Sequence, residues 1–117
     1  MKLRITMMGL LAAAALLAAD VTGTWTFAVQ TSAGSGSPTF VLKQDGEALG
    51  GTYSGALGEA KVTGTVKGND VYITFTVDAG GDTAKVEYTG VLDGDKKIKG
   101  KVKMGTFAEG TFTGEKK

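Results

Sequence analysis

The chain has 117 residues, with 13 basic and 12 acidic side chains, 19 glycines and neither histidine nor cysteine. The usual ligand sets for zinc, copper or haem and the Ser-His or Cys-His nucleophiles therefore cannot be assembled, and we expect no metal, no cofactor and no catalytic residue. The near-neutral charge gives little long-range attraction to nucleic acid or to a membrane, and disulfides cannot stabilise the fold.

The chain begins with the pattern of a secretory leader. Lys2 and Arg4 precede an uncharged apolar run from Ile5 to Ala19, shorter than the ~20 residues of a membrane span. We predict a signal peptide over residues 1–19, the alternative being an uncleaved anchor. Cleavage would leave a single domain of residues 20–117, with 11 lysines against 12 acidic residues, in the periplasm or outside the cell.

From residue 21 onward, apolar and polar residues alternate with period two, and turn sequences such as "DG" and "GND" interrupt them. Asp-Gly and Asn-containing pairs favour tight hairpins. The pattern predicts an all-β, eight-stranded antiparallel up-and-down (meander) barrel, because closure removes the exposed edges of such a sheet. The predicted strands are residues 21–31, 39–44, 48–57, 60–67, 71–78, 83–92, 97–104 and 107–113.

The seventh predicted strand shows the two faces most clearly, with Ile98 and Val102 on one face and four lysines on the other. We expect the lysines to face water and the apolar face to line the barrel. Seven glycines fall on the inward faces of the strands. Four of them, Gly23, Gly51, Gly64 and Gly90, would lie toward the end where the chain begins and let the barrel narrow there. They would also leave room there for Trp25, Tyr53 and Tyr88 to lie across the axis.

The loops predicted for the two ends differ in composition. Tight acidic turns collect at the end where the chain begins, and hairpin geometry explains them without a metal or catalytic role. At the other end, residues 31–38, "TSAGSGSP", form the only long loop in the prediction. Gly- and Ser-rich loops are mobile, so this segment is interpreted either as a lid over a mouth or as slack chain.

Two quoted segments, "VTGTWTF" and "TFVLKQDGEALGGTYSGALG", resemble the avidin and streptavidin family, from Val21 to about Val66. A Gly-x-Trp first strand heading a meander is also similar, more loosely, to lipocalins. The resemblance implies an eight-stranded up-and-down barrel. It places Tyr53 where the family has the tyrosine that hydrogen-bonds biotin.

Other positions of the biotin site depart from the family pattern. Phe27 stands where the family has an asparagine, Gly55 stands where it has a serine, and Trp25 is the only tryptophan. A site that has lost the partners of polar ligand atoms loses much of its affinity for that ligand. We therefore expect no tight binding of biotin.

Three classes of function remain open. The first is a non-catalytic carrier that binds a small apolar ligand inside the barrel, since eight strands enclose either packed side chains or one small ligand. The second is a structural or interaction module with a filled core, acting through its loops or its outer lysine face. An enzyme is the third, and no residue supports it. We expect a monomer because the outward apolar residues are scattered, and we predict an interior site lined by Trp25, Phe27, Tyr53, Phe75, Tyr88 and Phe112.

Overall fold

The computed structural model describes residues 20–79, 81–106 and 108–117, so the predicted leader and Phe107 lie outside the described residues. Within the described part, the chain forms only strands and turns, and it offers no helix that is long and apolar enough to cross a membrane. The strands are β2 (Gly23–Thr31), β3 (Gly34–Gly36), β4 (Thr39–Asp45), β5 (Ala48–Gly55), β6 (Gly58–Lys67), β7 (Asp70–Ala79), β8 (Asp82–Asp93), β9 (Lys97–Met104) and β10 (Ala108–Lys116).

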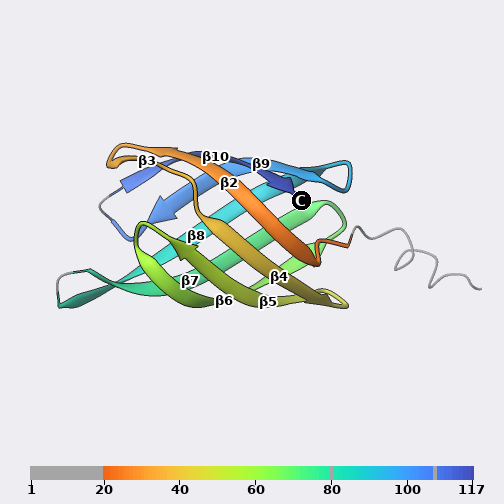
Figure 1. The fold of residues 1–117 in the computed structure, drawn as a ribbon, viewed down its shortest axis with the longest axis horizontal. Helices are drawn as coiled ribbons and strands as arrows, with labels where there is room; N and C mark the ends of the chain where they lie inside the picture. The colour runs from red at the N-terminus through yellow and green to blue at the C-terminus, as the bar shows by residue number, and fades with distance from the viewer. Residues whose placement is uncertain (1–19, 80, 107) are drawn as a thin grey trace, which may run out of the picture.

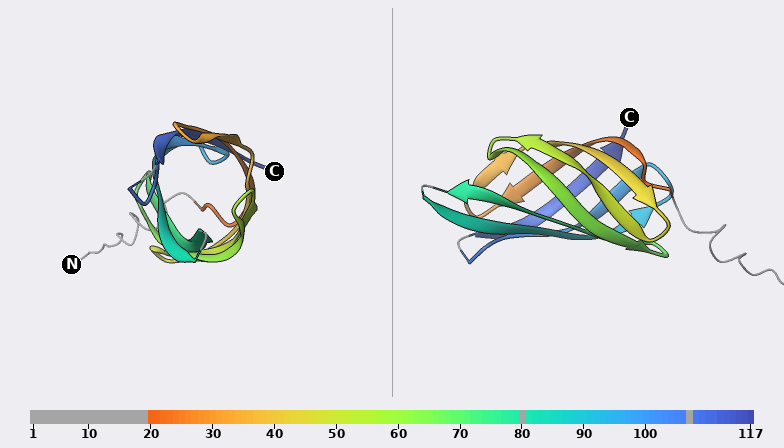
Figure 2. Two further views of the ribbon diagram at one scale, coloured as in Figure 1. Left: turned by 90° about the vertical axis from the view of Figure 1, so that its left-hand side faces the viewer. Right: turned by 90° about the horizontal axis from the view of Figure 1, so that it is seen from below.

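The eight long strands close into one antiparallel barrel. Each pairs with its neighbours in chain order from β4 to β10, and β2 pairs with both β4 and β10. The closing pair places Lys116 opposite Trp25 and Gly110 opposite Thr31. Seen end-on, the strands form a complete ring (Figure 2), and the tilted strands are visible from the side (Figure 1). The predicted eight-stranded up-and-down barrel is confirmed.

The segment of residues 31–38 is not the long loop that the sequence suggested. The chain turns at Ser32 and Ala33 and returns as β3, which places Gly36 opposite Val29 (Figure 1). The Phe27 N–H then donates to the Pro38 carbonyl over 3.0 Å, so β3 and β4 follow one another along β2. Glycine and serine give no apolar alternation, and pairing with β2 supplies the order that the local sequence does not.

The last strand also differs from its prediction. It continues to Lys116, three residues beyond the predicted end at Thr113, because Gly114, Glu115 and Lys116 pair with β2. These residue types have little strand preference of their own. Closure of the barrel therefore determines where β10 ends.

Alternation along the strands places apolar side chains inside and charged side chains outside, as expected. On β9, Ile98 and Val102 are buried, whereas Lys97, Lys99, Lys101 and Lys103 are exposed. The interior is filled by a contiguous cluster in which aromatic ring centroids lie 4.4–6.4 Å apart. Among the described residues, no charged side chain is buried.

Two glycines show why small residues are needed inside these strands. A Cβ atom on Gly64 would lie 1.8 Å from the Tyr72 carbonyl oxygen, and one on Gly51 would lie 1.9 Å from that of Val41. Gly51 also has a φ of 142°, which L-residues with side chains rarely adopt. At these positions the neighbouring strand occupies the space of a side chain, so the sheet can coil tightly.

The end of the barrel where the chain begins is plugged, and we call it the closed end. Val21 and Trp25 are both completely buried there. The Trp25 indole N–H donates to the Val21 carbonyl over 2.8 Å, and the Val21 N–H donates to Gln44 Oε1 over 2.9 Å. The indole N–H of Trp25 and the backbone N–H of Val21 are thereby both hydrogen-bonded, as buried polar groups normally are.

Candidate ligand site at the barrel mouth

The opposite end, which we call the mouth, contains a hollow of about 160 Å³. It lies between the β2–β3 hairpin on one side and the β5–β6 turn on the other, with Tyr53, Tyr88 and Met104 also in its wall. None of the described residues that line it is a lysine, an aspartate or a glutamate. Its apolar lining residues are Val29, Ala33, Pro38, Ala56, Leu57 and Met104.

The β2–β3 hairpin is tied to the barrel wall. The Ser32 N–H donates to the Glu109 carbonyl of β10 over 3.1 Å, and Thr31 Oγ1 donates to the Gly34 carbonyl over 3.0 Å. In the described part of the chain, β3 has β2 as its only strand partner, so its other edge is left without one. The hairpin therefore has a fixed base, and its free edge borders the hollow.

Tyr53 and Tyr88 both line the hollow at the mouth. Tyr53, on β5, is 3% exposed, and its hydroxyl oxygen accepts the Leu57 N–H over 3.3 Å. Tyr88, on β8, is 2% exposed and packs its ring against Phe40 and Phe112, with centroids 5.3 and 5.0 Å away. Both tyrosines therefore have buried rings in the core and belong to the wall of the hollow.

The Tyr88 hydroxyl is the unusual group of this site. Among the residues that the structure describes, none makes a hydrogen bond to it, whereas such a bond is found for the Tyr53 hydroxyl. Burial raises the pKa of Tyr88 well above its ordinary value of 10.0, and the nearby Tyr53 raises this pKa further. The hydroxyl is thus protonated at physiological pH and able to donate a hydrogen bond.

The other four predicted site residues lie in the core below the mouth. Trp25 is at the closed end, which corrects the expectation that Trp25, Tyr53 and Tyr88 share the narrow end. Phe27 packs between Phe40 and Phe112, with centroid distances of 4.4 and 4.9 Å. Phe75 stacks on Tyr53 at 4.4 Å, and Phe112 lies 5.0 Å from Tyr88. Ligand contact by these four residues stays a prediction.

The sequence-based site list did not include the residues that form the rim. Val29, Pro38, Leu57 and Met104 line the hollow, together with the small residues of the hairpin. From their Gly- and Ser-rich composition, residues 31–38 were interpreted either as a lid at this end or as slack chain. Leu57 gave no such signal, because its place at the rim follows from the tight turn between β5 and β6.

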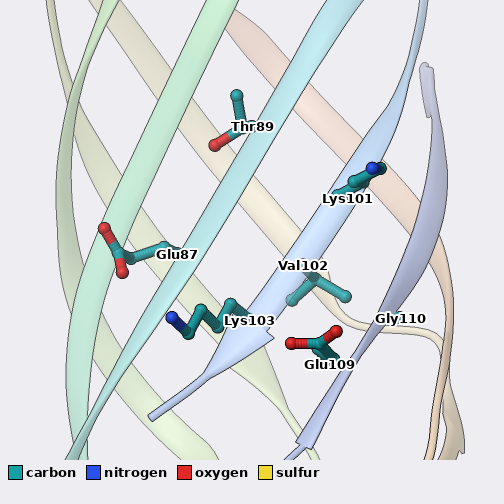
Figure 3. Close-up of a pocket in the computed structure, with 7 residues that line it drawn as sticks. All are labelled: Glu87, Thr89, Lys101, Val102, Lys103, Glu109 and Gly110. Atoms are coloured by element: carbon teal, nitrogen blue, oxygen red, sulfur yellow. The ribbon is translucent and has the colours of Figure 1, made fainter. Parts of the chain in front are cut away.

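A second hollow, of about 240 Å³, lies on the outer face of β8, β9 and β10 (Figure 3). Lys103 stands between Glu87 on β8 and Glu109 on β10 in the strand register, so opposite charges flank it. Lys101 is flanked by Thr89 and Thr111 instead. This face is open to solvent, where ion pairs contribute only about 0–1 kcal/mol, and it resembles an ordinary solvated strand surface.

The acidic turns do not form an evident metal site. Among the described residues, no group of three carboxylates is arranged so that it could hold a metal ion. At the closed end, the Asp20 carboxylate accepts the Thr22 N–H over 2.9 Å. This hydrogen bond lowers the pKa of Asp20 and explains its position as a local turn contact.

Comparison with known proteins supports the fold and gives no family. No family model matches the chain, and no curated protein matches it. Among solved structures, EF1p2_mFAP2b bound to DFHBI is similar, with 17% identity and a TM-score of 0.65 over 89% of this chain and 97% of that one. The redesigned β barrel mFAP1 bound to DFHBI is also similar, with 15% identity and a TM-score of 0.62 over 89% of this chain and 98% of that one. The chain thus has the fold of closed eight-stranded antiparallel barrels.

Proposed function

We propose that this protein is a secreted, non-catalytic barrel that binds a small apolar molecule at the mouth of its interior. The observation that carries the proposal is a hollow whose described lining residues are uncharged and include the buried Tyr53 and Tyr88. Ligand pockets are typically apolar with a few orienting polar groups. The binding of DFHBI by the two similar structures supports the same class of function.

The remaining parts of the proposal follow from the sequence and the surface. The leader pattern of residues 1–19 supports export to the periplasm or the medium. The exposed apolar side chains Val41, Leu57 and Val91 lie on different parts of the barrel and form no patch, which supports a monomer. We also propose that biotin does not bind tightly, because Phe27 supplies no polar atom and is packed within the core.

The alternative is an interaction module that acts through its outer face. The filled aromatic core supports it, since packed interiors are normal and need no ligand. The row of lysines on β9, with threonines beside Lys99 and Lys101, would then be the surface to test. The neutralising carboxylates beside Lys103 weaken this alternative.

Native mass spectrometry of the protein exported by living cells tests the proposal. We expect a discrete bound mass that is released on denaturation. Val29→Phe, which adds volume at the rim of the hollow, should abolish that mass. Val91→Phe is the matched control, because Val91 is 49% exposed on the outside, and it should retain the mass. A clean apo mass in all three proteins would contradict ligand carriage and favour the outer-face alternative.

A further inference from the structure

We propose that the mouth selects a neutral, single-ring molecule with a carbonyl-type hydrogen-bond acceptor, which the Tyr88 hydroxyl binds. This inference rests on the proposed function, since it assumes that the hollow holds a ligand. The inference adds the chemical class of the ligand and names the residue that recognises the ligand.

The first step of the argument is the missing partner of Tyr88. A buried hydroxyl that makes no hydrogen bond destabilises the folded protein, so such groups are uncommon. Tyr88 is 2% exposed, and no partner for its hydroxyl occurs among the described residues. Phenylalanine would fill the same ring position against Phe40 and Phe112 without this cost. An acceptor atom on a ligand in the hollow supplies the partner that the protein does not.

Tyr53 supplies the second polar contact. Its hydroxyl oxygen accepts the Leu57 N–H. The described residues supply no acceptor for the hydroxyl's own proton, so that proton can be donated to a ligand. The two tyrosines therefore both act as donors toward the hollow. A carbonyl oxygen has two lone pairs and accepts two hydrogen bonds, so it matches this pair better than a hydroxyl or an amine does.

The uncharged lining of the hollow favours a neutral ligand. None of the described residues that line it carries a charge, and an ion that loses water without gaining a partner is unfavourable. The protonated Tyr88 provides a hydrogen bond but no positive charge. A carboxylate or an ammonium group that entered the hollow would lose part of its hydration and meet no counter-ion among the described lining residues. A neutral carbonyl compound loses much less hydration free energy when it enters the hollow.

The volume of the hollow matches a ligand with one ring. A closed apolar cavity of about 150 Å³ is known to accommodate one benzene molecule. The hollow at the mouth is about 160 Å³, so one six-membered ring with a short substituent fills it. Packed side chains occupy the core next to the hollow, where the rings of Phe75 and Tyr53 are stacked 4.4 Å apart.

Three probes of similar size separate the features of this ligand: acetophenone is neutral with a carbonyl oxygen, cumene lacks the acceptor, and benzoate is an anion. Ligand-observed NMR titrations would give their affinities for the mature protein. We expect acetophenone to bind about tenfold more tightly than cumene, the equivalent of one hydrogen bond of about 1.4 kcal/mol. Benzoate should bind more weakly still.

Variants assign the preference to Tyr88. Tyr88→Phe should reduce acetophenone affinity to that of cumene while leaving cumene binding unchanged. Tyr53→Phe should remove a smaller part of the preference. Tyr72→Phe is the matched control, because its hydroxyl donates to Glu87 over 2.6 Å on the outer face and lies outside the hollow. It should bind all three probes like the natural chain, and circular dichroism would verify that each variant folds.

The outcomes distinguish this inference from the proposed function. Equal binding of acetophenone and cumene, or a preference that survives in Tyr88→Phe, would overturn the assignment of the ligand class while leaving a small-molecule carrier. Failure of every probe to bind, together with a clean apo mass from living cells, would overturn both. Tight binding of benzoate would show that charge is accepted and would also overturn the inference.

Discussion

The two ends of the barrel treat buried polar groups in opposite ways. At the closed end, the Trp25 indole N–H and the Val21 N–H both have hydrogen-bond partners within 2.9 Å. At the mouth, the Tyr88 hydroxyl is as deeply buried and has no partner among the described residues. Both ends belong to one continuous core. The closed end thus pairs the donors that it buries, whereas the mouth leaves one donor without a described partner, which supports the binding site proposed there.

The largest expected effect concerns the closed end. Trp25→Ala should lower the free energy of unfolding by about 3–5 kcal/mol, because it removes a fully buried side chain and leaves a cavity. Leu57→Ala at the mouth, where the side chain is 38% exposed, should cost less than about 1 kcal/mol. Urea unfolding of both variants measures the difference. Equal losses would contradict the division of the barrel into a stabilising end and a binding end.

The next effect concerns the tight coil of the strands. Gly64→Ala should destabilise the fold by about 1–3 kcal/mol, because its Cβ would overlap the Tyr72 carbonyl oxygen. Gly36→Ala is the control at the mouth, where a Cβ meets nothing within 4 Å, and its effect should be neutral or slightly stabilising. Thermal unfolding of the pair measures both. A stable Gly64→Ala variant would show that the strands do not need this glycine.

The stability of the protein at alkaline pH tests the burial of the Tyr88 hydroxyl. Because burial raises the pKa of Tyr88, the unfolded chain loses this proton first as the pH rises. The raised pKa of Tyr88 therefore contributes fully to the free energy of unfolding below pH 10.0, the ordinary tyrosine pKa. Above that pH the contribution is lost, by up to about 1.4 kcal/mol per pH unit. Urea unfolding between pH 9 and 11 should show this loss.

Tyr88→Phe is the control for the pH effect and should show a shallower decline. The hydrogen bond from Tyr72 to Glu87 also raises the pKa of Tyr72. Tyr72→Phe should therefore remove a separate and smaller part of the loss of stability at alkaline pH, because that side chain lies on the outer face. An unchanged pH dependence in Tyr88→Phe would mean that its hydroxyl is solvated in the folded state.

The smallest effect is expected on the outer surface. Lys85 and Glu87 lie 3.9 Å apart as an exposed ion pair. Lys85→Gln should change the free energy of unfolding by no more than about 0.5 kcal/mol, and added salt should reduce that change further. Chemical unfolding at low and high salt measures it. A larger loss would mean that the outer face contributes more to stability than a solvated strand surface does.

Much of the fold could be predicted from the sequence, because one physical pattern repeats along it. Alternation places Ile98 and Val102 inside and the neighbouring lysines outside, and Asp-Gly turns fix the hairpins. Closure follows because an open meander would leave two exposed edges. The β2–β3 hairpin was missed because glycine and serine carry no such alternation.

The site was harder to predict because it depends on how far each strand is shifted along the barrel. Sequence placed Trp25, Tyr53 and Tyr88 on the inward face, and the structure confirms that their side chains are buried. The sequence could not show that Trp25 lies at the closed end and the two tyrosines at the mouth. The position of a residue along the barrel axis depends on how far its strand is shifted relative to its neighbours. Whether a hollow remains depends on side-chain packing, which the pattern of apolar residues does not specify.

The most direct test of the division between the two ends is a paired measurement on Tyr88→Phe, its free energy of unfolding and its affinity for acetophenone. Removal of an unpartnered hydroxyl should leave stability unchanged or raise it by up to about 1 kcal/mol. Affinity should fall about tenfold, the equivalent of one hydrogen bond. A loss of stability with unchanged affinity would contradict the account, because the hydroxyl would then be an ordinary part of the core.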